Sequence, residues 1–320
     1  MILDWHSHIY TPEEAADDLR TWDGNTGPSW GERGCPMVLE NFLRAHQENK
    51  IDISVVTNAA HYLKGKRDGE ELKSVQSWTD YAAKVQQDHK GVLYSFATIL
   101  PCRGPAFIKE TERAIKQCGL KGVFIHSSHK GQYPDDDEAR PFWELIQDLD
   151  VPVMVHPPHL GFGEERMKEY RLASSIGRPF DLCLALGRLI VLGVLVDFPR
   201  LKIVASHGGG GICETISRMD YAYELQDEAF FLGPYKPMKI KRKPSDYMKM
   251  MYMDTVCYNP PAAKMVLEWL GPDQVLYGSD APPLTSLKPR AIKLVQDLDI
   301  PAADKEKIFW SNARRLLKLN

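Results

Sequence analysis

The chain has 320 residues, a length that fits either two average domains or one large barrel. Hydrophobic residues make up 43% and charged residues 26%, which is ordinary for a globular protein and excludes a disordered, collagen-like or coiled-coil chain. The formal net charge of -3 lacks the basic excess that a phosphate backbone favours, so we expect no nucleic-acid partner.

Short apolar runs rich in β-branched residues recur along the chain and alternate with helical patterns, which is typical of parallel βαβ units. Most runs are apolar on both faces, as strands with helices outside and a core inside should be. We therefore expect an α/β protein, a (β/α)8 TIM barrel, in a single domain that covers residues 1–320. The eight expected strands are residues 2–5, 53–57, 92–96, 122–125, 153–155, 203–205, 252–256 and 274–278.

The connections between these strands carry helical patterns. In residues 105–118, for example, apolar residues recur at helical spacing until Gly119 ends the run. Two connections are unusually long, residues 9–36 after the first expected strand and 208–250 after the sixth. Long loops in a compact domain are usually lids or binding loops, so both segments are candidates for such a role.

The six cysteines form no CxxC pair and no dense framework, which argues against a disulfide scaffold and a zinc ribbon. The first residues lack the basic region and apolar run of a signal peptide, and no stretch of about 18 apolar residues occurs. We therefore expect a cytoplasmic protein that is not attached to a membrane.

The polar residues at the ends of the expected strands indicate where chemistry takes place, because active sites of such barrels lie at the carboxyl ends of the strands. Five of the ten histidines occupy such positions, together with one aspartate. In chain order the residues are His6, His8, His126, His156, His207 and Asp280.

His6 and His8 form a His-x-His pair on an extended strand, which points both imidazoles to the same face. His156 and Asp280 could supply two further ligands from across the barrel. Imidazoles with a carboxylate suit zinc first, although manganese also accepts this mixture, and an open position would make the site catalytic. The alternative for the pair alone is a hydrogen-bonded surface motif, which the other strand-end residues make less attractive.

His207 precedes the glycine run 208–211, which allows the backbone to approach a ligand closely. Because an imidazole titrates near neutral pH, His207 could act as a general acid/base. It could also be a further metal ligand, or a turn histidine followed by glycines for purely structural reasons.

Four fragments occur in a specific order, although each alone is weak: His6-x-His8, His156-Pro157, His207-Gly208-Gly209-Gly210 and Gly278-Ser279-Asp280-x-Pro282. In this order they resemble the α-amino-β-carboxymuconate-ε-semialdehyde decarboxylase branch of the amidohydrolase superfamily. Residues 197–203 and 312–316 extend the resemblance over nearly the whole chain.

This resemblance implies that His6, His8, His156 and Asp280 bind one zinc ion. It also implies that His207 is the catalytic acid/base, with Asp280 counted as catalytic beside it. Dinuclear relatives use a carbamylated lysine at the end of the fourth strand, where this chain has His126, so a second metal is not expected. His126 either contacts the substrate or has a structural role.

Two arginines have roles implied by the resemblance. Related enzymes clamp the substrate carboxylate with an arginine in the first long loop, for which Arg33 is the nearest candidate. Arg218 lies where the family places an arginine that reaches the site of a neighbouring subunit, which implies a homodimer; a surface salt bridge is the alternative. Relatives usually carry an aromatic residue where this chain has Ala281, so the pocket wall differs.

These observations predict a metal-dependent decarboxylase of a small aromatic or muconate-type carboxylic acid. The rival within the same fold is a hydrolase or hydratase acting on a carbon-carbon, amide or lactone substrate, because fold does not determine the reaction. A non-catalytic metal-binding barrel is a third reading, and the presence of all five polar positions argues against it.

Overall fold

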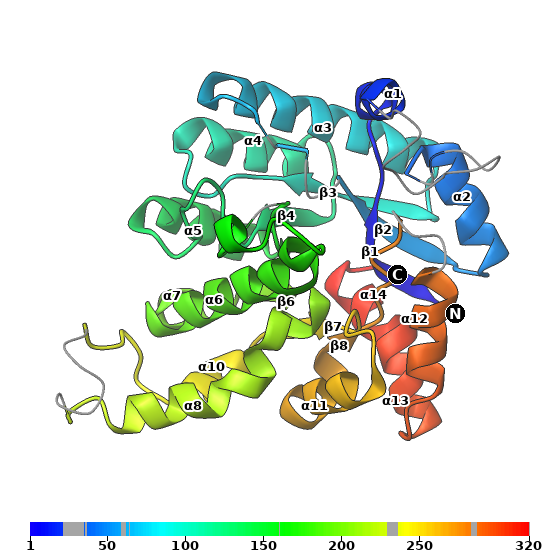
Figure 1. The fold of residues 1–320 in the computed structure, drawn as a ribbon. Coiled ribbons are helices and arrows are strands. Elements are labelled where there is room, and N and C mark those ends of the chain that lie inside the picture. The colour runs from blue at the N-terminus through cyan, green and yellow to red at the C-terminus, as the bar shows by residue number, and fades with distance from the viewer. Residues whose placement is uncertain are drawn as a thin grey trace.

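The structure is a computed structural model that describes residues 1–21, 35, 37–58, 62–63, 65–159, 161–228, 236–282 and 287–319. Its eight strands are parallel and pair in chain order, β1 to β8. Hydrogen bonds from Trp5 N to Tyr277 O and from Asp280 N to His6 O, both 2.9 Å, join the segment after β8 to β1. The sheet is a nearly closed barrel surrounded by helices (Figure 1), which confirms the predicted (β/α)8 class.

All eight expected strands are present, with ends that shift by up to a few residues. The strands are β1 (Leu3–His8), β2 (Ile53–Thr57), β3 (Leu93–Thr98), β4 (Gly122–His126), β5 (Pro152–His156), β6 (Lys202–Ala205), β7 (Tyr252–Asp254) and β8 (Val275–Leu276).

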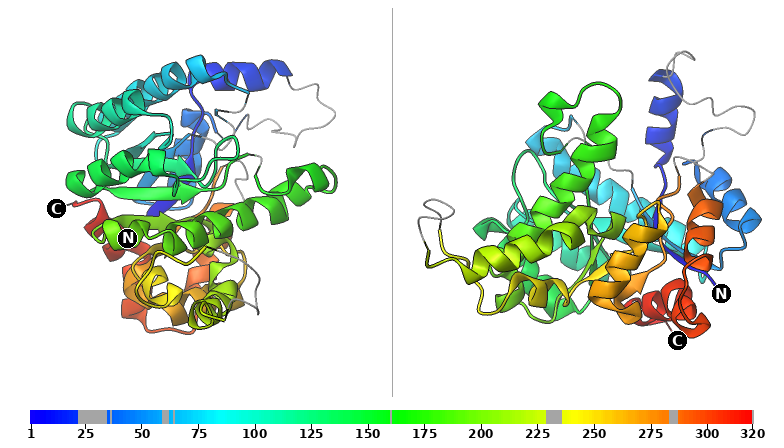
Figure 2. Two further views of the ribbon diagram at one scale, coloured as in Figure 1. Left: turned by 90° about the vertical axis from the view of Figure 1, so that its left-hand side faces the viewer. Right: turned by 60° about the horizontal axis from the view of Figure 1, so that its bottom comes forward.

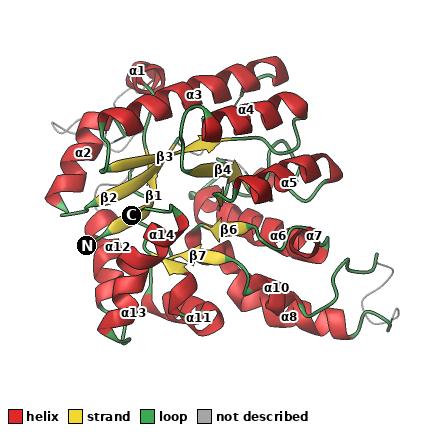
Figure 3. Ribbon diagram, turned by 180° about the vertical axis from the view of Figure 1, so that it is seen from behind, coloured by secondary structure: helices red, strands yellow, loops and turns green. Residues whose placement is uncertain are grey.

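Helices form the outer layer, seen from behind in Figure 3. The longer ones are α1 (Pro12–Thr21), α2 (Leu39–Glu48), α3 (Asp68–Asp88), α4 (Pro105–Lys116), α5 (Arg140–Leu149), α6 (Arg178–Val191), α8 (Ile212–Glu224), α11 (Pro260–Leu270) and α12 (Leu287–Gln296). Short α-helical segments are α7 (Val194–Asp197), α10 (Pro244–Met248), α13 (Ala302–Glu306) and α14 (Asn312–Leu316). The 3-10 turns are η2 (Asp137–Ala139), η3 (Glu164–Arg166), η5 (His207–Gly211) and η6 (Pro272–Gln274), and η4 (Ala173–Gly177) and η7 (Lys307–Ser311) are π-helical.

The barrel interior is a compact apolar cluster that alternate residues of the strands supply. Leu3, Trp5, Ile53, Val55, Phe96, Phe124, Met154, Val204 and Leu276 belong to it, and residues of α14 close it at the amino-terminal end of the barrel. Trp5 and Phe96 meet edge to face, with ring centroids 5.3 Å apart. Because side chains alternate along a strand, the inward positions of Phe124 and Met154 carry His126 and His156 inward two residues later.

A bulge in β1 changes this alternation. Asp4 pairs with Ser54 and Ser7 with Val56, so two residues of β1, Trp5 and His6, lie opposite the single residue between those partners. Both can then face the interior, Trp5 in the apolar cluster and His6 above it. Without the bulge, strict alternation from Leu3 would turn His6 and His8 to the outer face of the barrel.

The two long connections contain helices. The first includes α1, which stands out from the barrel wall in Figure 2, and the second includes α8 and α10. Of the first connection, residues 22–34 and 36 lie outside the described residues. Among the described helices, none is both long enough and apolar enough to cross a bilayer.

Candidate metal centre and active site

Four side chains from different parts of the barrel converge at its carboxyl-terminal mouth. One ligand atom from each of His6, His8, His156 and Asp280 can be chosen so that all lie within 4.8 Å of one another. The Nε2 atoms of His6 and His8 are 3.1 Å apart, and each is 3.3 Å from Asp280 Oδ1. Two ligands about 2.1 Å from a tetrahedral ion lie about 3.4 Å apart, so the spacing suits one shared cation.

The outer ring nitrogens of the three histidines all have hydrogen-bond partners. His6 Nδ1 lies 2.6 Å from Asp254 Oδ2, His8 Nδ1 2.9 Å from Asn58 O, and His156 Nδ1 2.7 Å from Pro157 O. An acceptor at Nδ1 keeps the proton there and leaves the Nε2 lone pair free. The donor set is therefore preorganised for a metal such as zinc or manganese.

The charges of the buried groups also favour a cation at this point. Burial lowers the pKa of His6, but the carboxylates of Asp254 and Asp280 outweigh it and raise this pKa to about 10. Burial lowers the pKa of His8 and that of His156, the latter strongly. Two carboxylates therefore face this point while burial favours the neutral forms of His8 and His156, an arrangement that suits a bound cation.

Asp280 follows β8 and has a φ of 54°, in the left-handed region. Its two oxygens have separate partners, because Oδ1 faces His6 and His8 while Oδ2 accepts a hydrogen bond of 2.9 Å from the Tyr258 hydroxyl. Burial tends to raise the pKa of Asp280, yet His207, His6 and His8 hold it well below its usual range. The carboxylate is therefore ionised and presents one oxygen to the centre.

His207 joins the same cluster from the end of β6. Its Nε2 lies 3.3 Å from His156 Nε2, and its ring centroid is 5.2 Å from that of His6. Burial lowers the pKa of His207, and the Asp280 carboxylate opposes this effect. Gly210 of the glycine run is sterically required, because a methyl group there would collide with the Pro179 carbonyl of α6.

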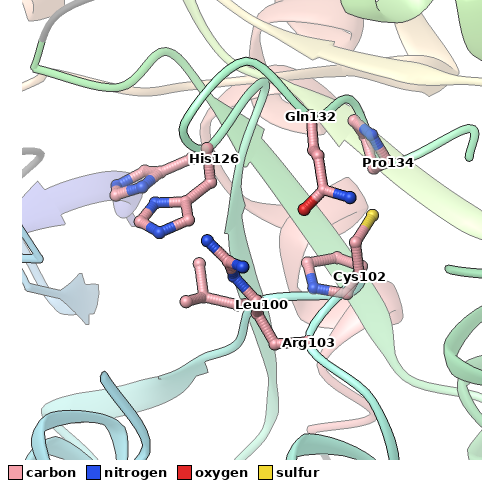
Figure 4. A pocket seen from close by; sticks show the side chains of 8 residues that line it. Leu100, Cys102, Arg103, His126, Gln132 and Pro134 are labelled. Carbon is pink, nitrogen blue, oxygen red and sulfur yellow. The ribbon is translucent and has the colours of Figure 1, made fainter. Parts of the chain in front are cut away.

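His126 is adjacent to this cluster rather than part of it. The ring of Phe124 lies near both, with its centroid 5.5 Å from His126 and 5.3 Å from His156. His126 lines a cavity of about 20 Å³, room for about one water, and Figure 4 shows Arg103 and Gln132 on the same cavity. Its buried Nε2 has no hydrogen-bond partner among the described residues, and burial lowers its pKa to about 3.

The structure describes one of the two arginines to which the family resemblance gave a role. Arg33 lies outside the described residues. Arg218 is exposed on α8, lines a groove between α6 and α8, and has no ion-pair partner in the described part of the chain. The surface salt bridge, which was the alternative for Arg218, is thus not formed within these residues.

Several residues that orient the cluster were not anticipated. Asp254 binds His6 Nδ1 and also accepts Gly208 N at 3.2 Å and Val256 N at 3.0 Å. Tyr258, which holds Asp280, was missed as well. Asp254 ends β7 and could have been found by the strand-end argument, whereas Tyr258 follows the strand and carries no comparable signal.

A (β/α)8 barrel with three histidines and an aspartate at its mouth is the arrangement expected of a metal-dependent hydrolase or lyase. The family model described as Amidohydrolase matches residues 4–319. The chain therefore belongs to this amidohydrolase family, which confirms the family resemblance drawn from the sequence.

Similar proteins are decarboxylases. The chain is 27% identical over 252 residues to 2-amino-3-carboxymuconate-6-semialdehyde decarboxylase of Dictyostelium discoideum, covering 78% of this chain and 67% of the relative. It is 28% identical over 234 residues to gamma-resorcylate decarboxylase of Polaromonas sp., covering 69% of each. The solved 5-carboxyvanillate decarboxylase of Sphingomonas paucimobilis has a TM-score of 0.86 at 21% identity, covering 100% of this chain and 99% of that one.

Proposed function

We propose that this chain is a single-domain, metal-dependent carboxy-lyase that removes a carboxyl group from a small aromatic or muconate-type acid. The observation that carries the proposal is the convergence of four ligand atoms within 4.8 Å at the mouth of an amidohydrolase-family barrel. The activities of the named relatives support decarboxylation over other reactions of this fold.

His6, His8, His156 and Asp280 would hold one divalent ion. Zinc is our first choice because imidazoles predominate, and manganese is the second, as it is bound in a similar dihydroxybenzoic acid decarboxylase of Polaromonas sp.. Such an ion supplies Lewis-acid stabilisation of negative charge that develops on the substrate.

The protein's own residues would orient the acid and move the proton. A proton adds to the carbon that bears the carboxyl group, the bond from that carbon to the carboxyl carbon then breaks, and carbon dioxide leaves while the electron pair of that bond passes into the conjugated system of the substrate. Burial lowers the pKa of His207, which favours the unprotonated ring, and its Nε2 lies 3.3 Å from His156 Nε2, so it can accept a substrate proton and pass it to that carbon. Asp280 stays ionised, and its hydrogen bond with Tyr258 keeps Oδ2 turned away from the centre.

The test is His207→Ala, assayed for release of carbon dioxide from 2,6-dihydroxybenzoate, 5-carboxyvanillate and 6-methylsalicylate. Metal content should stay near normal while turnover falls by about 10²- to 10⁴-fold, the usual contribution of a general acid/base. His89→Ala, which changes a histidine at the end of α3, is the matched control and should keep full turnover. Unchanged turnover in His207→Ala would show that His207 is not the general acid/base. Turnover of esters, lactones or amides from a wider panel, without release of carbon dioxide, would favour the hydrolase or hydratase alternative.

A homodimer in the cytoplasm completes the proposal. The groove between α6 and α8 measures about 590 Å³, and its rim exposes Phe162, Phe180 and Leu184 by 51%, 52% and 39%. Apolar surface of this kind commonly marks a protein interface, and Arg218 lines the same groove. Light scattering on wild-type protein and on Phe180→Glu should give a dimer and a monomer. No disulfide joins the six cysteines in the described part of the chain, which supports a reducing compartment.

A further inference from the structure

Arg178 is the first residue of α6, directly after the π-helical turn η4. Its guanidinium is fixed to the loop that follows β5, because Nε donates to His159 O at 3.1 Å and one terminal nitrogen lies 3.1 Å from His159 Nδ1. His159 is three residues beyond His156, so these bonds hold Arg178 next to the strand end that supplies one of the candidate metal ligands. Three of the five N–H groups of the guanidinium remain available.

Arg178 is distinctive because its charge is half-buried and has no carboxylate partner within the described residues. Other half-buried arginines are paired: Arg113 with Glu110 and Asp80, and Arg188 with Asp135. Withdrawing a cation from water without an opposite charge is costly. Burial accordingly lowers the pKa of Arg178, and Asp280 and Tyr258 oppose this effect.

Arg178 therefore lies within electrostatic range of the candidate metal centre. Its positive charge also contributes to the low pKa of His126. His126 ends β4, the strand that pairs with β5 and places His126 opposite His156. An anionic group that entered the mouth of the barrel would supply the missing negative charge, and a planar fork of N–H donors matches a carboxylate better than any other common anion except phosphate.

We propose that Arg178 binds a carboxylate of the substrate through the N–H groups that His159 leaves free. This inference rests on the proposed function, because it assumes that the ligand of the mouth is a carboxylic acid. It assigns to a residue of the described chain the role that the sequence assigned to Arg33. His159 is then a positioning residue, since it fixes the guanidinium without touching the ligand.

The experiment compares binding of 2,6-dihydroxybenzoate and of the uncharged 2,6-dihydroxybenzamide by calorimetry, using metal-loaded protein with the wild-type residue at 178 and three variants, all of which carry His207→Ala so that the acid is not turned over. Arg178→Met removes the charge, and Arg178→Lys keeps the charge without the fork. Arg171→Met is the control, because Arg171 is exposed in the same connection and its side chain has no partner in the described residues. Metal content and thermal unfolding verify that each variant is folded.

Wild type and Arg171→Met should prefer the acid to the amide. Arg178→Met should bind the acid about 10- to 100-fold more weakly, as expected for a lost charge-assisted pair, and should bind the amide nearly unchanged. The affinity of Arg178→Lys for the acid should lie between those of wild type and Arg178→Met. The proposal is overturned if wild type shows no preference for the acid, or if folded Arg178→Met retains it. Binding is measured without turnover, so an acid that binds through Arg178 but releases no carbon dioxide would refute the decarboxylase and not the carboxylate site.

Discussion

Replacing Asp254 with asparagine tests whether the metal centre depends on the residues behind it. Asp254 accepts three hydrogen bonds, one at Oδ2 from His6 and two at Oδ1 from the backbone N–H groups of Gly208 and Val256. Asparagine has the same shape but one acceptor oxygen. Its amide group must therefore face either His6 or the two backbone donors.

Each orientation has a different consequence. If the amide NH2 group faces His6, it donates to Nδ1 and moves the ring proton to Nε2, the atom that must bind the ion. Changes to such orienting partners cost about 10- to 100-fold in metal affinity, which corresponds to about 1.4–2.7 kcal/mol. If NH2 instead faces Gly208 and Val256, two buried donors lose their acceptor, and stability falls by about 1–3 kcal/mol for each.

The assay is competition of the stripped protein with a chelator for zinc and for manganese, together with thermal unfolding of the same samples. Asp135→Asn is the matched control, since Asp135 is a buried carboxylate whose partner is Arg188 rather than a histidine of the cluster. The control should lose stability and keep wild-type metal affinity. Asp254→Asn with unchanged affinity and unchanged unfolding temperature would refute the reasoning.

Two further predictions concern stability. Lys288→Met should lower the free energy of unfolding by about 3–5 kcal/mol, because it strands the buried charge of Asp4, now 2.8 Å from Lys288 Nζ. The double variant Asp4→Asn/Lys288→Met should recover part of this loss in urea unfolding, and a purely additive loss would contradict the pairing. Burial holds the pKa of His126 at about 3, below its unfolded value of about 6.5. The unfolded chain therefore binds the extra proton as pH falls from about 6.5 to 3, and this part of the stability is lost in that window, by up to about 1.4 kcal/mol per pH unit. His126→Gln should reduce the slope of unfolding free energy against pH between 4 and 6.5, and an unchanged slope would show that His126 is not the group responsible.

The number and order of the strands were predictable because buried parallel strands are continuous apolar runs. Their ends were less predictable, because backbone N–H groups near the strand ends form hydrogen bonds with partners outside the sheet. The eighth strand was expected over residues 274–278 but ends at Leu276, since Tyr277 N bonds to Ile308 O of η7. The seventh ends at Asp254 rather than Val256, since the Asp254 side chain accepts Val256 N and turns the chain.

The site was predictable only in part, because local irregularities and contacts between distant segments determine how its residues are oriented. His-x-His spacing correctly brings His6 and His8 together, yet their inward direction depends on the bulge between Asp4 and Ser7, which no pattern in the sequence indicates. The Asp254 partnership links residues 248 positions apart, and such a contact follows from closure of the barrel. Arg178 begins a helix and carries no signal of its own, so its relation to the centre emerges only from the bonds to His159.

The backbone at the site is strained, and the polar groups beneath it explain how that strain is sustained. His207, Tyr258 and Asp280 are non-glycine residues with φ of 49°, 60° and 54°, a conformation that commonly costs about 1–3 kcal/mol at each residue. Asp280 is held next to Ser279, whose N–H and hydroxyl both donate to Asp4, at 3.0 and 2.6 Å. Burial raises the pKa of Asp4, but Lys288 and the neighbouring hydroxyls bring it below its ordinary value, so this anchor stays charged and its hydrogen bonds stay strong. The buried Lys288–Asp4 pair thus helps to hold Asp280 in the orientation that faces His6 and His8. Loss of Lys288 should therefore lower the metal affinity as well as the stability of the fold.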